Sequence, residues 1–212
     1  LGLPYVGCDV MSSALGMDKV LFKNVLSDRG IPTLRCVDFG ARQWALECDE
    51  IVSKVNAEIG YPMIVKPANL GSSVGISKVE DEAQLRSAVD LACSFADRVL
   101  IEHAVIGLRE INCSVLGDRN DCKPSCLEEP VMHDKILSYD DKYRANASKS
   151  GSKGMASLSR KLPADLSPEK TKEIQDIAVE TFKAIGAAGV VRIDFLMDTA
   201  DNDKVYVNEI NT

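Results

Sequence analysis

The last part of the chain carries the residues best suited to chemistry. Arg192 and Asp194 lie in one segment of alternating apolar and polar residues, and Glu209 and Asn211 lie in another. Such alternation is typical of half-buried strands, in which side chains two residues apart share a face. The polar link at 198–203 predicts a hairpin between them. If its register aligns the polar faces, three oxygen donors and one guanidinium converge, and Mg²⁺ takes oxygen ligands. On these residues alone, two exposed polar faces with an incidental salt bridge are the alternative.

A glycine-rich loop is the second candidate site. Gly71 and Gly75 bracket Ser72 and Ser73, shortly after an apolar segment that ends at Lys66. Such a loop can direct backbone N–H groups and hydroxyls at an anion. A lysine at the end of a strand is an effective point charge for a phosphate. The spacing differs from that of the P-loop and of the dinucleotide-binding fingerprint, so a hairpin loop without a ligand is the alternative.

Two acidic residues and a lysine could extend a nucleotide site. Glu102 ends one strand-like segment and Glu110 opens the next. Carboxylates at such a junction can accept hydrogen bonds from an adenine amino group or from ribose hydroxyls. Lys142 and Tyr143 lie in the polar segment 138–160, whose length indicates a functional or a disordered loop. Solvated side chains are the alternative for each residue taken by itself.

Helix and strand signals alternate along the chain and would position these residues. Asp18 predicts the cap of a helix that ends at Gly30, and a second helix ends at Gly60. Two further helices are expected, at about 81–95 and from Ser167 to near Gly186. Strands are expected at 33–39, 62–66, 99–102 and 111–116, with a less regular stretch to Met132 before the polar loop and the closing hairpin. This order predicts an α+β fold.

Composition excludes several classes of partner. The net charge is −7 and no basic block occurs, so nucleic acid is not expected as a partner. No apolar run reaches roughly 18 residues, so no membrane span is predicted. Seven cysteines are scattered without a disulfide or zinc spacing, and the only histidines are His103 and His133. We therefore expect free thiols in a reducing cytosol.

Six motifs follow one another along the chain: MDK (17–19), GYPMIVKPANLGSSVGISKV (60–79), VLIEH (99–103), YDDKY (139–143), VRIDF (191–195) and NEINT (208–212). In this order they resemble the D-alanine–D-alanine ligase family of the ATP-grasp superfamily. The resemblance implies an α+β ATP-grasp fold, two subdomains with the nucleotide between them. It divides the chain into the end of an N-terminal domain with a linker (1–17), a central subdomain (18–103) and a truncated C-terminal subdomain (104–212).

The resemblance also implies a role for each site residue. ATP phosphates would be contacted by Lys19, Lys66, Ser72, Ser73 and Lys142. Adenine and ribose would be held by Glu102, His103, Val105 and Glu110. Two Mg²⁺ ions, which Mn²⁺ can replace, would be bound by Asp194, Glu209 and Asn211, with Glu209 bridging them. Arg192 would stabilise the oxyanion, and Tyr143, hydrogen-bonded toward Ser72, would favour a dipeptide product over D-alanyl-D-lactate.

The reaction implied is the ATP-dependent joining of two D-alanine molecules for peptidoglycan precursor synthesis in the cytoplasm. One carboxylate would attack the γ-phosphoryl group, and the second amine would then displace phosphate from the acyl phosphate. Another ATP-grasp carboxylate–amine ligase, or one that uses D-lactate or D-serine, is the enzyme alternative. A nucleotide-binding module without activity is the alternative of another class. Homodimers are common in the family. Because parts of the family's substrate site are missing, the chain is expected to bind nucleotide better than it performs ligation.

Overall fold

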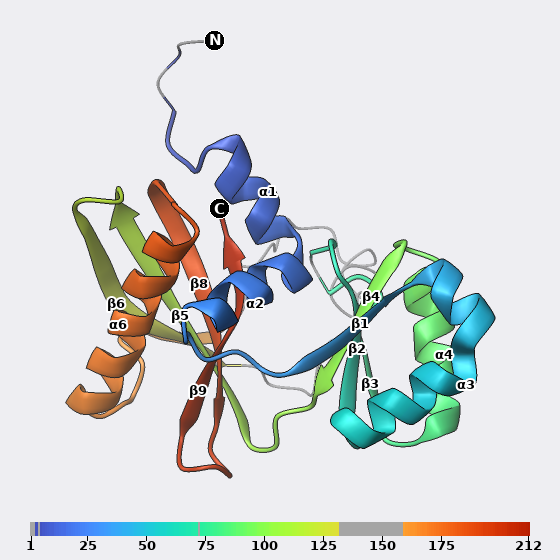
Figure 1. Cartoon of the computed structure of the whole chain (residues 1–212). Coiled ribbons are helices and arrows are strands. Elements are labelled where there is room, and N and C mark those ends of the chain that lie inside the picture. The colour runs from blue at the N-terminus through green and yellow to red at the C-terminus, as the bar shows by residue number, and fades with distance from the viewer. Residues whose placement is uncertain (1–2, 4, 72, 132–158) are drawn as a thin grey trace, which may run out of the picture. The chain divides into compact units, whose positions relative to one another are not determined.

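The computed structural model describes residues 3, 5–71, 73–131 and 159–212. These residues form two compact α+β units, each with its own sheet and hydrophobic core. Residues 34–104 make up the four-stranded unit, and the other described residues make up the five-stranded unit (Figure 1). The predicted α+β class is thereby confirmed. Among the described residues, no helix is both long enough and apolar enough to cross a membrane.

The four-stranded unit has helices on one face of an antiparallel sheet with strand order β1-β4-β2-β3 (Figure 1). Val65 and Ile101 belong to the core that the helices cover, whereas Lys66 and Glu102, next to them in sequence, lie on the opposite face. Because successive side chains of a strand point to opposite faces, Val65 packs in the core while Lys66, the candidate phosphate-binding residue, lies on the other face of the sheet. The elements are β1 (Cys36–Gly40), α3 (Ala41–Glu58), β2 (Met63–Pro67), β3 (Ser77–Val79), α4 (Glu82–Cys93) and β4 (Arg98–His103).

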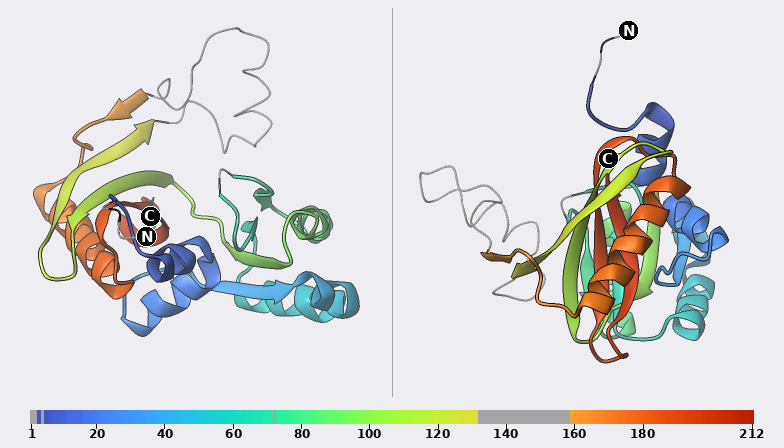
Figure 2. Two further views of the ribbon diagram at one scale, coloured as in Figure 1. Left: turned by 90° about the horizontal axis from the view of Figure 1, so that it is seen from above. Right: turned by 90° about the vertical axis from the view of Figure 1, so that its left-hand side faces the viewer.

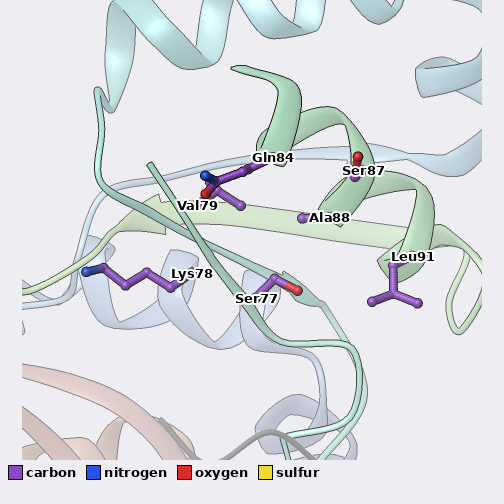
Figure 3. Close-up of a pocket in the computed structure, with 7 residues that line it drawn as sticks. All are labelled: Ser77, Lys78, Val79, Gln84, Ser87, Ala88 and Leu91. Atoms are coloured by element: carbon purple, nitrogen blue, oxygen red, sulfur yellow. The ribbon is translucent and has the colours of Figure 1, made fainter. Parts of the chain in front are cut away.

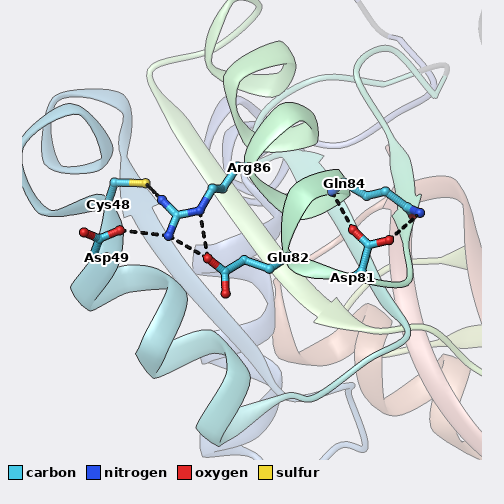
Figure 4. Close-up of polar contacts among 6 residues, drawn as sticks. All are labelled: Cys48, Asp49, Asp81, Glu82, Gln84 and Arg86. Carbon is cyan, nitrogen blue, oxygen red and sulfur yellow. Dashed lines mark hydrogen bonds and ion pairs between the residues drawn. The ribbon is translucent and has the colours of Figure 1, made fainter.

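Arg86 on α4 joins the two helices of this unit (Figure 4). Its guanidinium donates to Cys48 Sγ at 2.9 Å and to Asp49 Oδ1 at 2.8 Å, both on α3, and to Glu82 Oε1 at 2.7 Å. The hydrogen bonds that Arg86 donates to Glu82 and Asp49 raise the pKa of Arg86, while burial raises the pKa of the Cys48 thiol. The contact therefore links α4 to α3.

The five-stranded unit has strand order β7-β6-β5-β8-β9. Helix α6 lies along one face of this sheet (Figure 2), and Phe182 of α6 and Phe22 of α2 pack with Phe195 of β8 in one core. All three phenylalanines are at most 1% exposed. The elements are α1 (Val10–Met17), α2 (Lys19–Asp28), β5 (Leu108–Gly117), β6 (Cys122–Val131), β7 (Ser159–Lys161), α6 (Pro168–Ala184), β8 (Gly189–Asp198) and β9 (Lys204–Asn211).

Helix α2 packs with this second core rather than with the four-stranded unit. Asp18 caps α2 by accepting hydrogen bonds from two backbone N–H groups, and Phe22 and Leu26 are fully buried in the five-stranded unit. The compact units therefore divide near residue 33, whereas the resemblance places a subdomain boundary at residue 18. Elements that were not expected include α1, the short strand β7 at the end of the polar segment, and the regular strand β6 in place of an irregular stretch.

Candidate functional site

The closing hairpin brings its two polar faces together in the predicted way. In the register of β8 and β9, Arg192 lies opposite Asn211 and Asp194 lies opposite Glu209. A bulge follows Asp194 in this register. It lets Val207 and Ile210, three residues apart, both enter the core. The bulge therefore keeps Glu209 and Asn211 on the polar face.

Five side chains of the five-stranded unit form what we call the hairpin cluster: Lys19, Arg192, Asp194, Glu209 and Asn211. Arg192 donates two hydrogen bonds to Asp194, from Nε to Oδ1 at 2.7 Å and from Nη2 to Oδ2 at 2.9 Å. Asn211 Nδ2 also donates to Asp194 Oδ2, at 3.0 Å. Lys19 Nζ lies 3.6 Å from Glu209 Oε2, and its side chain is only 7% exposed. Two cations thus balance two carboxylates.

Burial and pairing act on these charges in opposite directions. Burial raises the pKa of Asp194, and the hydrogen bond from Arg192 works against that rise. The same hydrogen bond raises the pKa of Arg192. The carboxylate consequently depends on its partners to remain ionised in a partly desolvated place.

The donor types of the hairpin cluster fit a hard divalent cation. Asp194 and Glu209 offer carboxylate oxygens, and Asn211, whose amide nitrogen binds Asp194, keeps its amide oxygen available. Within the described ranges, no group of three or more His, Cys, Asp or Glu residues is placed to hold a metal ion. An ion here would therefore need water and phosphate oxygens to complete its coordination, which is how Mg²⁺ is usually bound.

The four-stranded unit holds a buried ion pair between two predicted nucleotide-binding residues. Lys66 Nζ lies 2.5 Å from Glu102 Oε1, and the side chains are 5% and 2% exposed. The register pairs Ile64 with Glu102 and Lys66 with Leu100, so the two charges are diagonal neighbours on one face of the sheet. A cation and an anion are thus held together on two paired strands, β2, which precedes the glycine-rich loop in sequence, and β4, which follows it.

The glycine-rich loop has a backbone shape that few residues can adopt. Val74 N–H donates to the Gly71 carbonyl at 3.2 Å, and Ser73 and Gly75 have positive φ of 60° and 68°. A Cβ on Gly75 would meet Pro67 Cγ at 2.9 Å. The loop is therefore held in a tight turn that leaves Ser73 half-buried.

The other predicted residues are placed as follows. His103 ends β4 and Val105 comes just after it, both half-buried, while Glu110 lies in β5 of the five-stranded unit. Ser72, Lys142 and Tyr143 lie outside the described residues. The roles of all these residues in binding remain predictions.

Two polar residues of the same sheet face as the hairpin cluster were missed in the sequence. Asn112 of β5 lies directly opposite Asp194 on one side and Glu128 of β6 on the other. The alternation in β5 marked Asn112 as a polar-face position, but its neighbours depend on the pairing of distant strands. Glu128 had no such signal, because its strand was not predicted.

A pocket of about 270 Å³ lies elsewhere in the four-stranded unit, between β3 and α4 (Figure 3). None of the predicted site residues lines it. Gln84, at its wall, already bonds Asp81 and the Glu80 backbone. Its lining consists of Ser77, Lys78, Val79, Gln84, Ser87, Ala88 and Leu91.

Comparisons with known proteins agree with the motif order. The family described as D-ala D-ala ligase C-terminus matches residues 25–212. D-alanine–D-alanine ligases from Acetivibrio thermocellus and a Thermoanaerobacter species are 38% and 41% identical to the whole chain, which covers 53% and 55% of their length. The chain thus spans about half the length of these relatives.

Two solved structures resemble the chain over 99% and 100% of its length. The D-alanine-D-alanine ligase from Coxiella burnetii is 33% identical with a TM-score of 0.77, and the chain covers 51% of it. The VanG D-Ala:D-Ser ligase from Enterococcus faecalis is 31% identical with a TM-score of 0.80, and 56% of it is covered. The predicted ATP-grasp fold is confirmed by these likenesses, and the chain belongs to the D-ala D-ala ligase C-terminus family.

Proposed function

We propose that this chain carries the ATP- and metal-binding part of an enzyme that joins two D-alanine molecules for peptidoglycan precursor synthesis. The hairpin cluster is the observation that carries the proposal. It combines oxygen donors suited to Mg²⁺ with a guanidinium held beside them, in a chain of the matching family. The cytoplasm as its location and a homodimer as its assembly are part of the same proposal.

In this proposal, the chain's own side chains stabilise charge as it moves. The carboxylate of one D-alanine attacks the γ-phosphoryl group of ATP, and ADP leaves. The amine of the second D-alanine attacks the resulting acyl phosphate, and the Arg192 guanidinium donates to the oxyanion before phosphate leaves. Lys66 and Lys19 would supply positive charge to phosphate oxygens. When bound, Mg²⁺ held by Asp194, Glu209 and Asn211 would neutralise further phosphate charge.

A phosphate-release assay tests this function. With ATP and Mg²⁺, we expect phosphate release to depend on D-alanine and not on L-alanine, with D-alanyl-D-alanine as the product. Release with another amino acid only would assign the chain to a different carboxylate–amine ligase. No release, together with tight nucleotide binding, would favour a binding module.

One of the similar solved structures is the VanG D-Ala:D-Ser ligase, which makes D-serine a second candidate for the attacking amine. The two functions separate when D-alanine is mixed with D-serine or D-lactate and the products are identified by mass. We expect the dipeptide of D-alanine to dominate, on the resemblance at Tyr143. A predominance of D-alanyl-D-serine would reverse the assignment of the second substrate.

A further inference from the structure

Four polar residues form a row across the five-stranded sheet, one on each of β6, β5, β8 and β9. Glu128 lies opposite Asn112, Asn112 lies opposite Asp194, and Asp194 lies opposite Glu209. All four are half-buried, whereas Cys113 and Ile193, their neighbours on the other face, are fully buried. Directly opposed residues in antiparallel strands have Cβ atoms about 4.5–5.5 Å apart. Asn112 is therefore a close neighbour of the predicted metal ligand Asp194.

Each carboxylate of this row has a cationic partner. Asp194 accepts hydrogen bonds from Arg192, and Glu209 forms an ion pair with Lys19. Glu128 Oε1 lies 3.1 Å from Arg160 Nη1. Asn112 is the neutral member of the four. Its side-chain amide makes no hydrogen bond with any residue in the part of the chain that the structure describes.

A half-buried amide that has no hydrogen-bond partner among the described residues, and that lies between two paired carboxylates, is placed to meet a ligand. Asp194 and Glu128 already accept hydrogen bonds or face guanidinium groups, so neither needs the Asn112 amide to balance its charge. A neutral amide oxygen attracts a divalent ion less strongly than a carboxylate does, and the ion already has carboxylates in Asp194 and Glu209. The amide oxygen readily accepts a hydrogen bond from a water molecule that the ion polarises, as outer-shell partners of metal sites do.

We propose that Asn112 is a positioning residue of the cation site, whose amide oxygen accepts a hydrogen bond from a water bound to the divalent ion at the hairpin cluster. This inference rests on the proposed function, since it takes that cluster as the metal site. It adds an oxygen group from β5 to donors that otherwise come only from the β8–β9 hairpin. The cation is thereby tied to a third strand of the sheet.

Titration with Mn²⁺ tests the inference without any measurement of turnover. Mn²⁺ is added to the chain alone and with saturating ADP, and the free ion is followed by its EPR signal, with ADP-only samples subtracted. We expect Asn112→Ala to weaken Mn²⁺ binding roughly 10-fold or more, as the loss of outer-shell partners does. Asn112→Asp keeps an acceptor oxygen in place and should bind within a few-fold of the parent chain, or more tightly.

Asn120→Ala is the matched control, because Asn120 is an exposed asparagine in the turn between β5 and β6. It should leave Mn²⁺ binding unchanged. Equal Mn²⁺ affinity in Asn112→Ala and the parent would overturn the inference and leave the proposed function standing. A loss in Asn112→Asp as large as in Asn112→Ala would also overturn it. A parent chain that binds no Mn²⁺ under either condition would overturn both.

Discussion

Arg192 holds a position in which one guanidinium can serve two partners. Two of its N–H groups bind Asp194, and its side chain is still 36% exposed on the polar face. A guanidinium has five N–H donors, so others remain for an oxyanion. In the proposed reaction, these remaining donors would be available to the oxyanion without a rearrangement of the Arg192–Asp194 contact.

We expect Arg192→Ala to cut D-alanine-dependent phosphate release by about 10²–10³-fold, as the loss of one oxyanion donor does. ATP affinity should change little, because the lysines rather than Arg192 are assigned to the phosphates. Turnover and nucleotide Kd are measured on the same samples. Arg160→Ala, which removes a more exposed guanidinium that pairs with Glu128, is the control. Equal losses of turnover and ATP affinity in Arg192→Ala would contradict the assigned role.

The Lys66–Glu102 pair leads to a prediction about stability. Lys66→Met should lower the free energy of unfolding by about 3–5 kcal/mol, because it leaves the buried Glu102 carboxylate without its cation. Combining Lys66→Met with Glu102→Leu should recover most of that loss, since two apolar side chains need no charge balance. Urea unfolding measures both. A double variant less stable than Lys66→Met would show that the ion pair is not the cause.

How far the sequence could predict single residues depends on how local the signal is. Alternation within β8 and β9 was enough to place Arg192 beside Asp194. The pairing of Lys66 with Glu102 joins strands 36 residues apart, so no local pattern shows it. Asn112 was missed for the same reason, because its neighbours on β6 and β8 are set by register rather than by spacing.

At the scale of elements, the sequence patterns predicted helices and strands correctly where the buried face was apolar. Helix α1 was missed because its buried face is made of small residues. Ser12 is buried and donates to the Ile185 carbonyl at 2.9 Å, and Gly16 is closely approached by Ile210. Its apolar Val10 is 87% exposed instead. The usual pattern is thus inverted, and no hydrophobic periodicity could reveal it.

Gly75, in the loop after β2, leads to a prediction for which Gly60 provides a matched control. Gly75→Ala and Gly60→Ala both place a Cβ at positive φ, 68° and 75°, which costs about 1–2 kcal/mol in each. Only at Gly75 would the new Cβ also press on Pro67 and Phe95, whereas Gly60 has open space. We expect Gly75→Ala to be the less stable variant and to bind ATP more weakly. Equal stability and equal ATP affinity in the two would contradict a fixed loop shape.

An ion pair between β5 and β6 leads to a prediction about the stability of the fold at acidic pH. The hydrogen bond from Arg109, 2.8 Å from Nε to Oε1, lowers the pKa of Glu129 below its ordinary value. A carboxyl with a lower pKa in the folded state stabilises the fold above its unfolded pKa, and this contribution is lost as pH falls through the folded pKa. The stability of Glu129→Gln should therefore fall less steeply than that of the parent below about pH 4.5. Urea midpoints at several pH values measure this, and identical slopes would contradict it.

For the whole molecule, the ordered motifs predicted the ATP-grasp fold, whereas local patterns predicted only an α+β class. The seven cysteines are free thiols, as their scattered spacing predicted. The grouping of α2 with the five-stranded sheet could not be predicted from the chain order, because Phe22 and Leu26 pack against elements more than a hundred residues away. Tertiary packing decides in which of the two cores a helix is buried, and the pattern of apolar residues within the helix does not indicate this.

Two separate cores predict that stability is lost unit by unit. Leu85→Ala removes a fully buried side chain from the core of the four-stranded unit, and Phe182→Ala removes one from the core of the five-stranded unit. Each should cost about 2–5 kcal/mol locally. In native-state hydrogen exchange, Leu85→Ala should lower protection in strands β1–β4, and Phe182→Ala should lower it in β5, β8 and β9. The two variants serve as controls for each other, because each reports on the unit that the other leaves intact. If either variant lowered protection equally in both sheets, the two cores would form one cooperative unit, and a ligand bound to one would stabilise the whole chain.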